Sequence, residues 1–475
     1  MDEREKLYDK FVASGGNPSI FFDEIDLVDI FDFATDCSDD GTRIKVIILA
    51  ERMYPESVEL NERRALLFYD LNDFGEVSRI IKKLPSNSFR GKLVWFKLQI
   101  LDKETIKREL ERLIESFDEF EDEWIIQLID YAEEKGLYDW LIDNKKLITS
   151  KTSYPQTYLY EMVNLAMERL DSVNALKLAE ELTELEPFNN EFWEILSDIH
   201  TNMFDDPVEG EKAIDYALAI NPDSLKSLLQ KSRILGELDK PIDEILPYLN
   251  RAIEIDPDLS EPVIAKALYT ASLGNLDSGI SILNRFYKKH PENLNVIEYL
   301  VKITDGNIGT DVFSEAFGKD NAPEEGEIIN MAITCYFDKS FNVAATLLKA
   351  YDRYVGLSYK LEPFEIFYRN GDYNEIISLY ERLNGDHNAL VTAIDLIYVL
   401  SRLRSGRLEG LREKVNEYKR FLELPPSIYI ALDDQLEGKT IYKYLESISK
   451  LLETDRPIDV DLIDPFMVVR GMDLN

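Results

Sequence analysis

The sequence contains few of the residues that most often carry chemistry. Its 475 residues include two cysteines, Cys37 and Cys335, and three histidines, His200, His290 and His387. The cysteines are far apart and show no paired spacing, which excludes a disulfide framework and suits a reducing compartment. No histidine has metal-ligand spacing or lies beside a cysteine. We therefore expect no metal site, no Cys–His nucleophile and no cofactor.

Long apolar runs and cationic side chains are also scarce. The longest nearly apolar run, residues 389–400, contains Thr392 and Asp395, and it is shorter than the ~20 residues that span a bilayer. Residues 1–6 do not resemble a secretory signal, so we expect a cytoplasmic protein. The chain has 54 basic and 91 acidic residues, a net charge of −37. Such acidity disfavours nucleic-acid and membrane partners and favours basic or neutral protein segments; the alternative is that it serves solubility alone.

Two short motifs superficially suggest nucleotide chemistry, and neither supports it. Residues 438–440, Gly-Lys-Thr, follow Asp433 where a phosphate loop needs glycine, and Asp434 would repel a phosphate. The pair Gly15-Gly16 lacks the further glycines of a dinucleotide fingerprint. The sequence therefore predicts a protein that is not an enzyme.

In place of these features the sequence contains an internal repeat. Pro187, Pro222, Pro257 and Pro291 are separated by 35, 35 and 34 residues, and each follows a helical pattern with a similar ending. A proline stops one helix, because its ring fixes φ and clashes with a preceding carbonyl, and it suits the start of the next unit. A constant period of about 34 residues is typical of stacked helix–turn–helix units.

The motifs of these units resemble the tetratricopeptide repeat family. They are Ser-Leu-Gly-Asn-Leu-Asp at 272–277, Arg-Asn-Gly-Asp-Tyr-Asn at 369–374, and the helix endings at 217–222 and 252–257. Four successive units fit between Gln156 and Pro291. The resemblance implies an all-α, right-handed superhelical solenoid of antiparallel helix pairs, with irregular capping helices at both ends. It also implies a concave face lined by the first helix of each pair.

A narrower resemblance comes from the N-terminal region. Gly15-Gly16, Phe21-Phe22-Asp23 and the run Arg63-Arg64-Ala65-Leu66-Leu67 are similar to uncharacterised tetratricopeptide proteins of the Bacteroidetes. An amphipathic helix is expected from Asp23 onward, either as a cap on the first repeat or as a detachable acidic motif.

The repeat pattern divides the chain into four regions. Residues 1–150 are expected to form an acidic N-terminal cap and degenerate helical repeats, and residues 151–305 the regular array. Residues 306–424 are predicted to form degenerate repeats. Residues 425–475 are predicted to form a C-terminal helix, from Tyr442, and an apolar tail that docks on its own body or mediates self-association.

A peptide-binding groove is the functional surface that the resemblance implies. Glu194 and Asp198 stand where a clamp for a terminal carboxylate would need lysine and asparagine, which argues against that mode. The groove is expected to be acidic near Glu194 and basic around Lys226 and Arg233, favouring an extended or helical peptide of complementary charge. Its predicted residues are Tyr160, Asn164, Glu194, Asp198, Lys226, Leu229, Arg233, Ile264 and Leu268.

These features predict a non-enzymatic scaffold that binds a peptide or a helical segment of a partner along its groove. Two alternatives stay open. One is a structural or assembly protein that acts through self-association, and the other is a regulator or enzyme with an unrecognised site.

Overall fold

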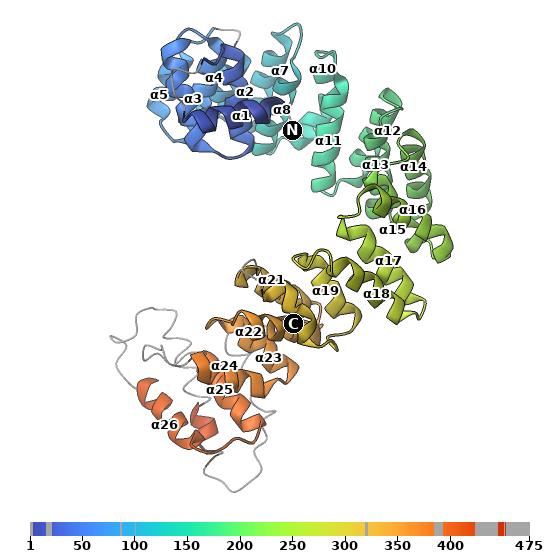
Figure 1. Ribbon diagram of the computed structural model, residues 1–475. Helices are drawn as coiled ribbons and strands as arrows, with labels where there is room; N and C mark the ends of the chain where they lie inside the picture. Colours follow the sequence, from blue (N-terminus) through green and yellow to red (C-terminus); the bar gives the residue numbers. More distant parts are fainter. Residues whose placement is uncertain are drawn as a thin grey trace. The chain divides into compact units, whose positions relative to one another are not determined.

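The computed structural model in Figure 1 describes residues 3–15, 21–85, 88–99, 101–318, 322–383, 393–422, 445–450 and 452. These residues are helices joined by short turns, and no strand occurs among them. The chain forms two compact units, Met1–Pro222 and Asp223–Asn475. The boundary between them follows the second of the four repeat prolines.

Unit 1 contains fourteen α-helices and one π-helical turn in its described part. They are α1 (Glu3–Ser14), α2 (Glu24–Asp36), α3 (Asp40–Met53), α4 (Val58–Asp70), α5 (Phe74–Ile81), α6 (Phe89–Leu98), α7 (Lys103–Glu115), α8 (Asp122–Glu134), α9 (Tyr138–Asp143), α10 (Lys145–Thr149), α11 (Pro155–Glu168), α12 (Ser172–Leu185), α13 (Asn190–Asp198), the turn η1 (Ile199–Met203) and α14 (Pro207–Ile220).

Unit 2 continues the pattern over its described residues. Its elements are α15 (Leu225–Glu237), α16 (Ile242–Ile255), α17 (Ser260–Ser272), α18 (Leu276–Tyr287), α19 (Leu294–Ile303), the 3₁₀ turn η2 (Thr310–Phe313), α20 (Ser314–Phe317), α21 (Glu325–Phe337), α22 (Phe341–Tyr354), α23 (Leu361–Asn370), α24 (Tyr373–Leu383), α25 (Ala393–Arg404) and α26 (Leu411–Leu422).

The prolines and caps explain where the helices begin and end. Pro187, Pro222 and Pro257 directly follow the C-caps of α12, α14 and α16, and Pro291 follows the end of α18. At the other end of the helices, short polar side chains accept hydrogen bonds from free backbone N–H groups. Asp171, for example, accepts from Asn174 N of α12 at 3.2 Å.

Two predicted local features are also present. The helix expected from Asp23 is α2, and a capping box joins Asp23 and Asp26 at its start. Gly274 and Gly371 have φ values of +83° and +82°, in the left-handed region that glycine enters without a Cβ clash. Gly371 is the C-cap of α23, so it ends that helix as the sequence predicts.

Neighbouring helices pack as pairs, and the pairs stack. The most extensive contacts join α11 with α12 and α13 with α14 in unit 1, and α15 with α16, α17 with α18 and α21 with α22 in unit 2. In unit 1, α2, α4, α6, α8 and α11 also contact one another in series. We call these five helices the first-helix layer. The all-α array of helix pairs predicted from the sequence is confirmed.

Side-chain hydrogen bonds between residues about one repeat length apart occur both inside and outside the regular stretch. Tyr160 Oη donates to Glu191 at 3.1 Å within that stretch, 31 residues apart. In the N-terminal region, Trp140 Nε1 donates to Glu111 at 3.0 Å, 29 residues apart. In unit 2, Arg404 Nε donates to the Tyr368 hydroxyl at 2.9 Å, 36 residues apart. Bonds one repeat apart therefore tie successive pairs together along both units.

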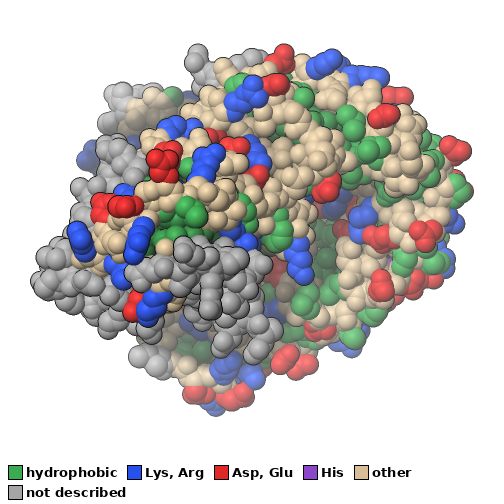
Figure 2. All heavy atoms as spheres, turned by 90° about the horizontal axis from the view of Figure 1, so that it is seen from below, with side chains coloured by type: hydrophobic (Ala, Val, Ile, Leu, Met, Phe, Trp, Pro, Cys, Tyr) green, Lys and Arg blue, Asp and Glu red, His purple; other side chains and the backbone are tan. Residues whose placement is uncertain are grey.

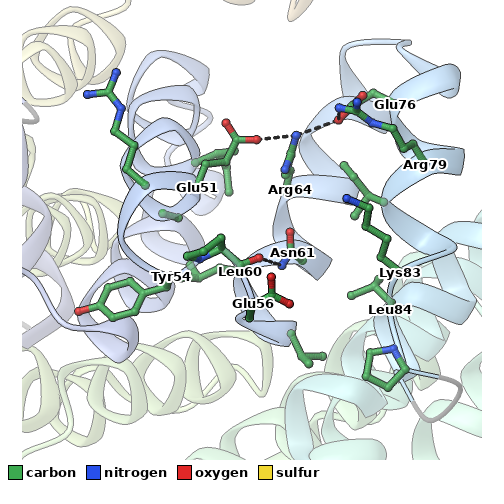
Figure 3. Close-up of a pocket in the computed structure, with 17 residues that line it drawn as sticks. Glu51, Tyr54, Glu56, Leu60, Asn61, Arg64, Glu76, Arg79, Lys83 and Leu84 are labelled. Atoms are coloured by element: carbon green, nitrogen blue, oxygen red, sulfur yellow. Dashed lines mark hydrogen bonds and ion pairs between the residues drawn. The ribbon is translucent and has the colours of Figure 1, made fainter.

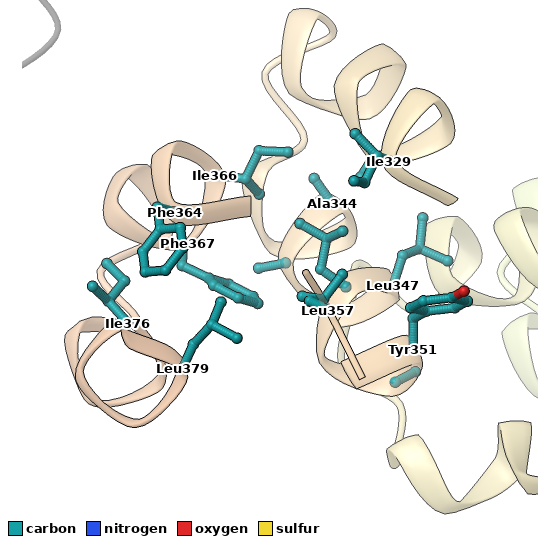
Figure 4. Close-up of a cluster of buried hydrophobic side chains, with 14 of the residues drawn as sticks. Ile329, Ala344, Leu347, Tyr351, Leu357, Phe364, Ile366, Phe367, Ile376 and Leu379 are labelled. Atoms are coloured by element: carbon teal, nitrogen blue, oxygen red, sulfur yellow. The ribbon is translucent and has the colours of Figure 1, made fainter. Parts of the chain in front are cut away.

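Each unit has its own hydrophobic core between the helix layers. The largest core of unit 1 runs from Phe89 to Ala213. In unit 2 a continuous core extends from Val263 to Ile448. Figure 4 shows part of it, with Phe364, Phe367 and Leu379 grouped at one end and Leu347 and Tyr351 at the other. Continuity from one pair to the next is what allows a solenoid to grow without one large core.

Several sequence predictions fall outside the described residues. They are His387, the Gly-Lys-Thr motif at 438–440 and the tail from 458 to 475. Of the helix predicted from Tyr442 to Leu452, residues 445–450 are described; they are helical, and Leu445 and Ile448 are buried in the core of unit 2.

Candidate binding surface

A polar network crosses the first-helix layer of unit 1. Arg63 of α4 is 3% exposed, and its Nε donates to Asp32 Oδ1 of α2 at 2.7 Å, while its Nη2 contacts Asp32 Oδ2. Nη2 also lies 3.8 Å from Glu123 Oε1 of α8. Burial alone would lower the pKa of Arg63, but the hydrogen bond and charge of Asp32 outweigh it and raise that pKa. One buried cation thus joins α2, α4 and α8.

A second buried arginine, Arg90 of α6, continues this network. Its Nη2 forms an ion pair with Glu123, whereas its Nε is buried without a hydrogen-bond partner. Beside it, buried Glu62 of α4 accepts from Ser88 Oγ at 2.5 Å, and Ser88 Oγ in turn caps α6 by accepting from Gly91 N at 2.9 Å. Desolvation raises the pKa of Glu62 despite the nearby arginines.

These side chains surround a cavity of ≈ 160 Å³ between α4, α6 and α8. Tyr131 of α8 lines it, and the Tyr131 hydroxyl is buried with no hydrogen-bond partner. Desolvation raises the pKa of Tyr131 to about 12, so the hydroxyl stays protonated at neutral pH. The lining residues are Asp32, Glu62, Arg63, Leu66, Arg90, Leu93, Val94, Lys97, Glu123, Gln127, Asp130 and Tyr131.

Carboxylates with raised pKa values continue along the layer. Asp130 of α8 is exposed, yet the surrounding protein desolvates its carboxyl in part and raises its pKa, against the charge of Lys97. Desolvation also raises the pKa of half-buried Glu161 of α11, and Asp130 adds to this effect. Among the described residues, neither carboxyl has an ion-pair or hydrogen-bond partner. Desolvation therefore disfavours the ionised form of both carboxyls.

A larger cavity, of ≈ 530 Å³, opens between α3, α4 and α5 (Figure 3). Its central cation is Arg64, whose Nη2 lies 2.5 Å from Glu51 and 2.8 Å from Glu76. Figure 3 shows Arg64 between these two carboxylates, with Arg79 and Lys83 farther along the wall. Glu51 and Glu76 already neutralise Arg64. Because these residues are on α3, α5 and α4, respectively, the two ion pairs join three helices.

Side chains that commonly bind metal ions do not gather at one place in the described residues. No group of three His, Cys, Asp or Glu side chains within them is arranged to hold a metal ion. His290 lies at a helix end, with Nε2 3.2 Å from Asp258 Oδ1. Desolvation raises the pKa of the buried Cys335 thiol to about 11, which keeps it protonated, and Cys37 is exposed. A thiolate nucleophile at Cys335 is therefore disfavoured at neutral pH.

The nine predicted groove residues lie on α11, α13, α15 and α17, four of them in unit 1 and five in unit 2. Glu194 and Ile264 are buried, and Glu194 accepts from Asn190 Nδ2 at 3.2 Å. Lys226 and Leu268 are exposed. The other five predicted residues are half-buried: Tyr160, Asn164, Asp198, Leu229 and Arg233.

The cavity between α4, α6 and α8 was missed in the sequence, because the acidic block at 111–134 suggests an ordinary solvated helix face. One available signal was the pair Glu62-Arg63 inside the apolar pattern from Leu60 to Leu67. A charged pair on the buried side of an amphipathic helix needs partners on neighbouring helices.

On the face drawn in Figure 2, acidic and basic side chains are interspersed and form no large patch of one sign. In the part of the chain that is described, no helix is both long and apolar enough to cross a membrane.

No family model and no curated protein matches the sequence. Similar solved structures include the C-terminal part of a TPR repeat-containing protein from Cytophaga hutchinsonii (12% identity, TM-score 0.36, 57% of this chain and 99% of that chain). Another is a tetratricopeptide repeat protein from Parabacteroides merdae (13% identity, TM-score 0.30, 61% of this chain and 98% of that chain). A third is a chain of Naa15/Naa10 bound to HypK-THB (12% identity, TM-score 0.32, 94% of this chain and 70% of that chain). The described part of this chain is itself an all-α array of stacked helix pairs.

Proposed function

We propose that this chain is a protein-binding scaffold, which holds a basic or neutral segment of a partner against the first helices of its helix pairs. The observation that supports this most is the unpaired state of Asp130 and Glu161 in the first-helix layer. Partial desolvation disfavours the ionised form of each carboxyl, and a cation from a ligand would offset that cost. A lysine or arginine of a partner would supply that cation.

The nine residues predicted from the repeat register divide between the two units, and we propose a separate contact surface in each unit. In unit 2, Lys226 and Leu268 are exposed on α15 and α17, where a segment bound to that unit would contact them directly. Glu194 of unit 1 and Ile264 of unit 2 are buried, and in this proposal each supports the surface of its own unit from beneath. The self-association alternative depends on the tail, which lies outside the described residues.

The proposal can be tested by fluorescence anisotropy with a labelled twelve-residue peptide of alternating lysine and alanine. The double variant Asp130→Asn/Glu161→Gln should weaken binding by about tenfold, because each carboxylate contributes a charge-assisted contact. The same peptide with glutamate in place of lysine should bind more weakly to the unmodified chain. Its residual binding should depend on Lys226 and Arg233.

A matched control separates a site from general attraction to an acidic protein. The double variant Asp118→Asn/Glu115→Gln removes the same two charges from exposed positions at the end of α7, outside the first-helix layer. We expect it to change binding by less than about twofold, because exposed charges act weakly through salt and water. Equal weakening by both double variants would contradict the proposal.

A further inference from the structure

The cavity between α4, α6 and α8 has an uneven charge balance. Three cations line it, and each already has an anionic partner: Arg63 pairs with Asp32, Arg90 pairs with Glu123, and Lys97 lies 3.4 Å from Glu134. Two further carboxyls line the same cavity, Glu62 and Asp130, and no ion pair within the described part of the chain includes either of them. The cavity therefore has room for one more cation.

Hydrogen bonding in the same wall is also incomplete. The Tyr131 hydroxyl is buried and lacks a hydrogen-bond partner. Tyr131 is 1% exposed, and buried polar atoms in proteins are nearly always hydrogen-bonded. Tyr131 lines the cavity, and a phenolic oxygen can accept a hydrogen bond as well as donate one.

The size of the cavity limits the ligand. Its ≈ 160 Å³ is below the roughly 300–1,000 Å³ of small-molecule sites and corresponds to about five water molecules at ~30 Å³ each. That volume fits the head group of a single side chain. Leu66, Leu93 and Val94 supply an apolar part of the lining, suited to a methylene stem that carries a charged tip.

We propose that this cavity binds the guanidinium group of an arginine in the partner segment. The inference rests on the scaffold function proposed above and names one anchor within it. A guanidinium is planar and offers five N–H donors in a fixed geometry, which suits acceptors on more than one helix, here α4 and α8. Lysine has three donors on a compact, strongly hydrated ammonium, and an acidic side chain would face the unpaired carboxyls Glu62 and Asp130.

The test uses the full chain and three five-residue peptides, acetyl-Gly-Ala-X-Ala-Gly-amide, in isothermal titration calorimetry. X is arginine, lysine or citrulline, which keeps the shape of arginine without its charge. We expect the arginine peptide to bind at least about tenfold more tightly than the citrulline peptide and about threefold more tightly than the lysine peptide. Equal binding of the arginine and citrulline peptides would overturn the inference.

Variants locate the binding. Asp130→Asn and Glu62→Gln should each weaken binding of the arginine peptide by about tenfold, and Tyr131→Phe by about fivefold. The matched control Asp118→Asn should leave it unchanged. Asp130 and Asp118 are both exposed, so both variants are expected to fold. Their effects on peptide binding can therefore be compared even if Glu62→Gln reduces stability. Insensitivity to Asp130→Asn would show that the guanidinium lies elsewhere and would overturn the inference.

The two proposals fail in different ways. If the lysine–alanine peptide binds in the anisotropy experiment but the five-residue peptides show no preference for arginine, the arginine cavity is wrong and the scaffold stands. If the arginine peptide binds and depends on Asp130 while no longer segment binds, the cavity stands and the scaffold is wrong.

Discussion

Replacing Arg63 by methionine should destabilise unit 1 by about 2 kcal/mol. Breaking a buried ion pair by removing one partner costs roughly 3–5 kcal/mol, because the other charge is left desolvated. Here the remaining partner, Asp32, has a side chain that is 24% exposed, so water can solvate part of its charge and reduce the cost. Methionine keeps the apolar stem of Arg63, which limits the effect to the lost charge and hydrogen bonds.

Tryptophan fluorescence isolates this effect experimentally. All four tryptophans, Trp95, Trp124, Trp140 and Trp193, lie in unit 1. A urea titration followed by their emission therefore reports the unfolding free energy of that unit, and a change in midpoint at constant slope measures the loss of stability.

Two further variants make the interpretation of Arg63→Met specific. Arg79→Met removes an ion pair with Glu76, but Arg79 is 65% exposed, and we expect no measurable change. The double variant Arg63→Met/Asp32→Leu should recover most of the stability, because a buried ion pair replaced by apolar groups is often neutral. If Arg63→Met is as stable as the unmodified chain, the buried cation does not hold α2 against α4 and the reasoning is refuted.

Three other predictions follow from single residues. Asp130→Asn should stabilise unit 1 at pH 7, because a raised carboxyl pKa means that ionisation opposes folding. The gain in unfolding free energy should disappear below the ordinary Asp pKa of 3.8, which urea titrations at several pH values would measure. A thiol reagent such as Ellman's should react with one cysteine per native chain, exposed Cys37, and reach buried Cys335 only after denaturation, because the thiolate is the reactive form. Gly371→Ala should destabilise unit 2 by about 1 kcal/mol in a urea titration by circular dichroism, because φ is +82° there, although open space surrounds the added Cβ.

The helix boundaries of the regular stretch could be predicted because local chemistry determines them. Pro222 and Pro257 follow helix C-caps, and Gly274 adopts the positive φ that its place in the turn requires. These effects depend on the residue itself and its near neighbours, so one sequence suffices. The groove prediction depends in addition on the register assigned to each helix, because a shift of one turn along a helix changes which side chains are buried. Buried Ile264 illustrates this sensitivity.

The binding cavity could not be predicted in the same way, because its residues come from four helices. Asp32 and Arg63 are 31 residues apart, and Glu62 and Ser88 are 26 apart. Composition shows that the region is acidic, but it does not show which carboxylates meet a cation. Only the packing of α4 against α6 and of α6 against α8 decides that Glu123 is paired and Asp130 is not.

The difference between Glu134 and Asp130 supports a role in binding rather than in stability. Both carboxyls are on α8 and both are influenced by Lys97. Despite desolvation, the pKa of Glu134 is lowered, first by a hydrogen bond from Lys135 and then by the charge of Lys97, whereas desolvation raises the pKa of Asp130. A layer arranged only for stability would pair its available cations with its most desolvated carboxylates. In unit 1 the carboxyls of Asp130 and Glu161, which have no ion-pair partner among the described residues, instead lie on the adjacent helices α8 and α11 of one layer, and Asp130 lines the cavity. Their cost to folding is explained if a cation from another molecule completes the surface.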